Sequence, residues 1–269
     1  MLKTRIVTAA ILGGLLLVVL FLAPAAFTRT MFGLTVVAGA WEWAAFGALR
    51  TPPARAAYAL CIAVLLWLAW SWTADPARLL WLLRVACLWW LLAFLWVTLA
   101  SGRQQPAVTL LCGVAVLVPA FVAIARLQAG SGTVAGSLAV LWLLLLVFGA
   151  DIGAYVVGRR FGRLKLAPRV SPSKTWEGLL GGMLAVALIA WGGAGAFDLP
   201  SAAAVGFGCA VGLASVVGDL TESMFKRSAG LKDSGALLPG HGGILDRIDS
   251  ITAAAPLYAL GLFGAGLFK

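Results

Sequence analysis

Long apolar stretches separated by short polar joins dominate the chain. The stretches occupy approximately residues 6–23, 31–49, 56–74, 79–100, 106–125, 134–157, 177–197, 201–220 and 250–268. Apolar residues follow one another without strict alternation over about 20 positions, which favours helices over strands. Pro52, Pro76, Pro106 and Pro200 lie at the joins, where helices start or stop.

The composition identifies the solvent of these helices. The sequence is 62% hydrophobic and 11% charged, whereas soluble domains carry about 25% charged residues. We therefore expect an all-α fold, a polytopic transmembrane helical bundle with about nine spans. It forms one membrane domain over residues 1–269, with scaffold spans in 1–133 and catalytic spans and loops in 134–269. The first stretch is longer than a signal-peptide core, so it is expected to be a retained span.

The charge pattern predicts an orientation. The net charge is +10, and the basic residues lie between spans, so we expect lipid and phosphates as partners and no nucleic acid. With the N-terminus inside, 15 Lys and Arg residues fall on the inside joins and 4 on the outside ones. The long joins 158–176 and 221–249 are then cytoplasmic. Eight of the ten acidic residues lie between Asp151 and Asp249, so the chemistry is expected in this half.

Three aspartates stand at the inside ends of two predicted spans. Asp219 ends the stretch 201–220, and Asp246 and Asp249 precede the last stretch at i and i+3. Such carboxylates can converge on Mg²⁺, with or without a second cation. The alternative is that the acids only form ion pairs with neighbouring cations, namely Lys226, Arg227 and Arg247.

Two inside segments have the composition of phosphate-binding loops. In 221–249, basic residues lie on both sides of the glycine-rich run Gly240-His241-Gly242-Gly243. The backbone of such a run can approach a phosphate closely. In 151–178, Ser171, Ser173 and Lys174 precede a predicted helix start, which suits either an anion site or a helix N-cap. No P-loop motif is present.

The run from Ser223 to Asp249 resembles the signature of the bacterial phosphatidate cytidylyltransferases, also called CDP-diacylglycerol synthases. The matching positions are Ser223, Lys226, Arg227, Lys232, Asp233, Pro239, His241, Gly242, Gly243, Asp246, Arg247 and Asp249. Flanking matches occur in Gly218-Asp219-Leu220 with Glu222, in Ser171-Pro172 with Lys174-Thr175, and in Asp151 with Gly158-Arg159. Ile152 departs from the hydroxyl residue of the family pattern, which weakens a binding role at that position.

The resemblance implies an enzyme of the bacterial inner membrane with its active site facing the cytoplasm. It would use CTP and phosphatidate to make CDP-diacylglycerol and pyrophosphate; a homodimer is compatible with the sequence. The candidate catalytic residues are Asp219, Lys226, Asp246, Arg247 and Asp249, and the candidate Mg²⁺ ligands are Asp219, Asp246 and Asp249. The candidate substrate-binding residues are Asp151, Arg159, Ser171, Ser173, Lys174, Glu222, Arg227, Lys232, His241, Gly242 and Gly243.

Three other classes of protein were compared with this pattern. A phosphatidyl-transferring enzyme would carry a DG-x-x-AR motif, which does not occur in the sequence. A transporter would show internal repeats and mid-membrane polar groups, whereas the charges here gather at one face. A membrane kinase that uses CTP to phosphorylate a lipid or polyprenol is the remaining alternative.

Overall fold

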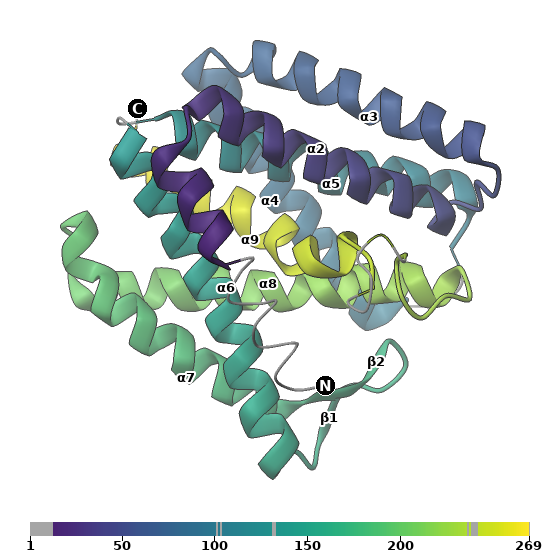
Figure 1. Cartoon of the computed structure of the whole chain (residues 1–269). Coiled ribbons are helices and arrows are strands. Elements are labelled where there is room, and N and C mark those ends of the chain that lie inside the picture. Colours follow the sequence, from purple (N-terminus) through teal and green to yellow (C-terminus); the bar gives the residue numbers. More distant parts are fainter. Residues whose placement is uncertain are drawn as a thin grey trace.

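A computed structural model describes residues 13–100, 102, 104–130, 133–235, 237 and 242–268. A helical segment, Gly13–Leu22, precedes the labelled elements (Figure 1). The elements that follow are α2 (Ala25–Phe46), α3 (Pro52–Trp72), α4 (Pro76–Leu99), α5 (Pro106–Ala129), α6 (Thr133–Phe161), β1 (Lys165–Ala167), β2 (Ser171–Thr175), α7 (Trp176–Gly193), the 3-10 helix η1 (Ala194–Phe197), α8 (Ser201–Ser228) and α9 (Leu245–Gly264).

The structure confirms an all-α membrane architecture to which one short β-hairpin is added. Among the described residues, six helices, α3 to α8, are long and apolar enough to cross a membrane. Helices α2 and α9 and the segment Gly13–Leu22 overlap the remaining predicted stretches. The total of nine spans therefore stays a prediction, as does the division at residue 133.

Two predicted loops are partly structured, which corrects the sequence boundaries. Helix α8 does not end at residue 220 but continues to Ser228, because its last charged residues find partners inside the protein. Helix α6 continues to Phe161, and the antiparallel pair β1–β2 fills much of the predicted loop 158–176. The joins remain, but both are shorter than the sequence pattern indicated.

Helix α9 lies at the centre of the bundle and contacts α8, α5 and α4. Figure 1 shows α2, α3 and α5 on one side of it, and α7 with the hairpin on the other. Large apolar side chains on α3, α4 and α7 are exposed, as expected for surfaces that face lipid. Residues 251–256 of α9 are buried, so the helix that carries the predicted catalytic acids is held on all sides.

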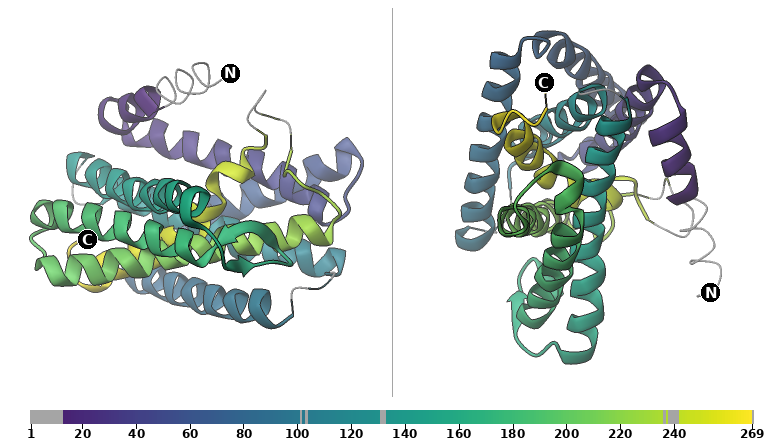
Figure 2. Two further views of the ribbon diagram at one scale, coloured as in Figure 1. Left: turned by 90° about the horizontal axis from the view of Figure 1, so that it is seen from below. Right: turned by 90° about the vertical axis from the view of Figure 1, so that its left-hand side faces the viewer.

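Helices α6 and α7 form a close pair that carries the hairpin at its end (Figure 2). A side chain at Gly182 could not fit, because an added Cβ would lie 2.6 Å from the backbone oxygen of Ala150. Small residues at such a contact let helix backbones approach closely in a membrane. The pair therefore holds the hairpin, and with it Lys174, in a fixed place.

Candidate active site

The hairpin ends where α7 begins, and local hydrogen bonds fix this junction. The Thr175 hydroxyl accepts a hydrogen bond from Gly178 N at 3.1 Å, which is an N-cap contact. Glu177 accepts bonds from the backbone N–H groups of Arg163 and Leu164 at 3.1 and 3.2 Å. The N-cap alternative for this segment is thus correct for Thr175. The preceding residue, Lys174, takes no part in this cap, and its side chain extends toward α8.

Lys174 reaches α8 and forms the first of two ion-pair clusters. Its Nζ lies 2.7 Å from Asp219 Oδ2, and both side chains are about one-quarter exposed. The two residues line a pocket of about 430 Å³ together with Asp151, Arg159 and Ser173. Five of the predicted site residues, separated by up to 68 positions in sequence, therefore meet in one place.

Lys226 forms the second cluster, which is more deeply buried. Its Nζ lies 2.5 Å from Asp246 Oδ1 and 3.1 Å from Glu222 Oε1. Burial tends to raise the pKa of the Asp246 carboxyl, but hydrogen bonds from Lys226 and Ser234 outweigh it and hold this pKa below its ordinary value. Asp246, in the first turn of α9 and ahead of the predicted span, is therefore held ionised.

The N-terminal half reaches this cluster through Glu42 of α2, whose side chain is buried. Glu42 accepts hydrogen bonds from Ile244 N at 3.1 Å, from Leu245 N at 2.8 Å and from the Ser234 hydroxyl at 3.0 Å. Ser234 Oγ also lies 2.8 Å from Asp246 Oδ2. A chain of polar contacts thus runs from α2 through the loop before α9 to the second cluster.

Close packing supports the Glu42 contact. A Cβ added at Gly243 would collide with the Glu42 carboxylate and the Ser234 hydroxyl, so a larger residue there would displace these two groups. Gly243 N donates to Asp246 Oδ2 at 3.1 Å. Gly242, its neighbour, has φ +82, a left-handed conformation that favours glycine. These two glycines therefore shape the backbone around Asp246, and direct contact with substrate stays a prediction.

Acidic groups lie close together between the two clusters. Asp219 repels both Asp249 and Asp151 electrostatically. Glu222 is repelled in the same way by Asp249 and Asp246. Both Glu222 oxygens are buried without a hydrogen bond of good geometry, although Lys226 is nearby. Such crowding of hard oxygen donors is what the predicted Mg²⁺ site would require.

The arrangement is nevertheless not a closed metal site. Within the described ranges, no group of three or more His, Cys, Asp or Glu side chains is placed to hold a metal ion. Asp219 and Asp246 contact Lys174 and Lys226, as the ion-pair alternative predicts, and Lys226 is one of the cations that this alternative had named. Metal ligation stays a prediction.

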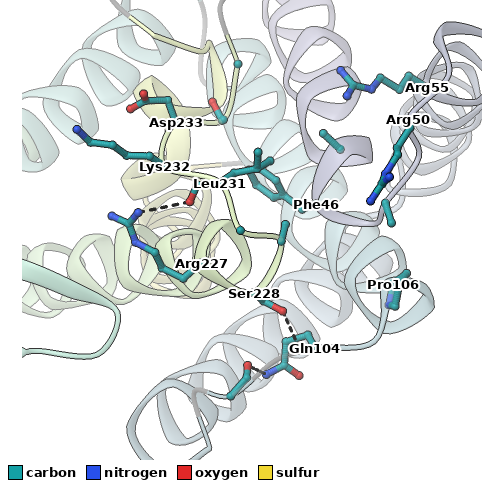
Figure 3. Close-up of a pocket in the computed structure, with 17 residues that line it drawn as sticks. Phe46, Arg50, Arg55, Gln104, Pro106, Arg227, Ser228, Leu231, Lys232 and Asp233 are labelled. Carbon is teal, nitrogen blue, oxygen red and sulfur yellow. Dashed lines mark hydrogen bonds between the residues drawn. The ribbon is translucent and has the colours of Figure 1, made fainter.

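A larger pocket of about 1100 Å³ lies beside the second cluster. Figure 3 shows Arg50 and Arg55 on one side of it and Arg227 and Lys232 on the other. In this conformation the heads of Arg227 and Lys232 extend outward, away from the two other arginines. The pocket joins three segments that the charge pattern places inside, near residues 50, 102–106 and 227–235.

The remaining predicted residues lie apart from these groups or cannot be placed. Ser171 pairs with Ala167 in the hairpin and does not line either of the two pockets described above. Arg247 lines a third, apolar pocket against α2, α5 and α6. His241 lies outside the described residues.

Sequence reasoning missed the contributions of Glu42, Ser234, Arg50 and Arg55. Glu42 does carry a signal, since an acid within an apolar stretch is costly unless it has partners. Its partners are backbone N–H groups and a serine about 200 residues away, which no local pattern reveals.

The fold and the site together define a polytopic helical membrane protein with paired acids and cations at one end of the bundle. The chain matches the profile of the cytidylyltransferase family over residues 3–263. It is 42% identical to the phosphatidate cytidylyltransferase of Pseudomonas aeruginosa, covering 99% of this chain and 98% of that protein. Identity to the enzyme of the same name in Haemophilus influenzae is 37%, covering 96% and 98%. A shorter match, 44% identical over 46% of this chain, is to the uncharacterized protein YnbB of Escherichia coli. The chain therefore belongs to the cytidylyltransferase family.

Proposed function

We propose that the chain is a phosphatidate cytidylyltransferase, which transfers CMP from CTP to phosphatidate and releases pyrophosphate. The observation that carries the proposal is its near full-length likeness to proteins of that name. The site supports it, because Lys174–Asp219 and Lys226–Asp246 unite residues from the segments expected to bind phosphates.

The reaction is a displacement at phosphorus. A phosphate oxygen of phosphatidate attacks the α-phosphorus of CTP, the bond to the β-phosphate breaks, and pyrophosphate leaves. The attacking phosphomonoester is already anionic near pH 7, so no general base is required. The protein's work is alignment and charge neutralisation. We assign the neutralisation to Lys174 and Lys226, each of which lies beside an acid that fixes its position.

The larger pocket suits the phosphates of CTP. Arg50, Arg55, Arg227 and Lys232 line it against a single acid, Asp233. Within the described structure these four cations form no ion pair with a carboxylate. Their charge is therefore available for a polyphosphate, which arginine and lysine bind well.

Mg²⁺ would be held by Asp219, Asp246 and Asp249, whose oxygen donors match its preference. When bound, it would supply positive charge to the phosphate oxygens. The proposal places this site on the cytoplasmic side of a bacterial inner membrane. Support comes from the 15-to-4 charge distribution and from the convergence of three predicted inside segments on one pocket.

The decisive assay is product analysis with purified protein in detergent. We expect pyrophosphate and CDP-diacylglycerol only when CTP and phosphatidate are both present. A CTP-dependent lipid kinase would instead release CDP and phosphorylate its lipid, so that product pattern would replace the proposal. Asp249→Asn, measured as turnover per folded molecule against Mg²⁺ concentration, tests the metal assignment; normal activity with unaltered Mg²⁺ dependence would contradict it.

A further inference from the structure

The third pocket is an apolar slot within the bundle, on the side of α9 that faces α2, α5 and α6. Its volume is about 230 Å³. Apolar side chains such as Phe32, Ala120 and Val140 form its walls. Packed protein interiors have few voids larger than a water molecule, and apolar cavities of about 150 Å³ already bind small hydrocarbons. The slot is therefore large enough to hold part of a hydrocarbon chain.

The polar atoms in its wall do not alter this character. Two threonines line the slot, and each hydroxyl donates to the backbone of its own helix: Thr35 Oγ1 to Met31 O at 2.9 Å, and Thr252 Oγ1 to Asp249 O at 2.6 Å. Neither hydroxyl needs a ligand or a water molecule as a hydrogen-bond acceptor. An aqueous or sugar-like occupant would thus find few partners along these walls.

One cation marks one boundary of the slot. Arg247 is exposed and belongs to the same first turn of α9 as the ionised Asp246. The slot therefore lies beside the turn of α9 that carries predicted catalytic residues.

From these walls and this position we propose that the slot between α2, α5, α6 and α9 binds an acyl chain of the phosphatidate substrate and so sets its chain-length preference. The inference rests on the proposed function for the identity of the lipid. Helix geometry places Arg247 about 200° from Asp249 around α9. The glycerol backbone must therefore connect a chain in the slot to a phosphate at the acids, around the first turn of the helix.

Filling the slot should shorten the preferred chain. Ala120 is buried on α5 and lines the slot, so Ala120→Leu adds volume inside it. We expect kcat/KM with dioleoyl phosphatidate to fall about tenfold or more, since pockets discriminate a methylene by roughly 10- to 200-fold. With dihexanoyl phosphatidate the change should stay under about twofold, and the KM for CTP should not move.

Two further variants protect this test. Leu111→Phe, on the same helix but 71% exposed, adds volume outside the slot and should keep the wild-type chain profile. Ile124→Ala enlarges the slot and should shift preference toward bulkier chains, which keeps the proposal testable if Ala120→Leu does not fold. An equal loss for every chain length, or an unchanged profile in both folded slot variants, would overturn the inference.

A binding experiment separates this inference from the enzymatic proposal. Phosphatidate with a photoreactive group at the chain end should crosslink to peptides of α5 and α9, and Ala120→Leu should reduce that labelling. Crosslinks confined to the outer faces of α3, α4 and α7 would refute the slot. If the slot were labelled but the protein released no pyrophosphate, the inference about lipid binding would be supported and the proposed function would be contradicted.

Discussion

Helices α2–α5 and helices α6–α9 contribute to the same site in different ways. The C-terminal set carries the paired charges within residues 174–246, where Lys174 contacts Asp219 and Lys226 contacts Asp246. The N-terminal set contributes one buried acid, Glu42, and arginines at the α2–α3 junction. The comparison shows that a region with only two of the ten acidic residues can still help to position the acids of the other region.

The largest effect is expected from Lys226→Met. This change leaves Glu222 and Asp246 without their shared cation in a buried position, and breaking a buried ion pair costs about 3–5 kcal/mol. Thermal unfolding in detergent should show a strongly lowered midpoint, with little activity left. Arg227→Met, one residue further and exposed, should alter stability by less than about 0.5 kcal/mol. Similar losses in both variants would contradict this distinction.

Glu42→Ala tests whether the N-terminal half holds the site. The change removes the acceptor of two backbone N–H groups and of Ser234, and each buried unsatisfied donor costs about 1–3 kcal/mol. We expect a loss of about 3 kcal/mol in the free energy of unfolding and lower kcat in the folded fraction. Glu42→Gln keeps one acceptor oxygen and should recover part of both. Unchanged kcat per folded molecule would show that Glu42 stabilises the fold but does not position the site.

The same comparison explains what the sequence could and could not predict. Apolar stretches located the helices because lipid requires an apolar surface of fixed length. The end of α8 was misplaced because Glu222 and Lys226 look like a polar loop, whereas they pair with each other inside the structure. The site residues in 151–178 and 219–249 were recognisable because they are dense in charge. Glu42 was not, since its contacts depend on how distant helices pack.

Lys174→Ala should separate binding from stability. The Lys174–Asp219 pair is about one-quarter exposed, and partly exposed pairs contribute less than about 1 kcal/mol. We therefore expect a small change in the melting temperature but a fall of about tenfold or more in kcat/KM, because the lysine reaches a pocket lined by acids. Lys165→Ala removes an exposed lysine from the same hairpin and serves as the control. Wild-type kinetics of the Lys174→Ala variant for both substrates would show that Lys174 does not take part in substrate binding.

Arg50→Gln is the mildest change and tests the N-terminal half at the larger pocket. Arg50 is exposed and enters the pocket from the side opposite Arg227 and Lys232 (Figure 3). Loss of one exposed cation should leave stability within about 0.5 kcal/mol.

The effect of Arg50→Gln should appear in substrate binding, with the KM for CTP raised about threefold to tenfold and the KM for phosphatidate unchanged. Because the contribution is electrostatic, the difference from wild type should shrink as salt is added. Arg169→Gln removes an exposed cation from the hairpin, outside the pocket, and should leave the KM for CTP unchanged. If Arg50→Gln instead raised only the KM for phosphatidate, the pocket would belong to the lipid headgroup, and the N-terminal arginines would act on the other substrate.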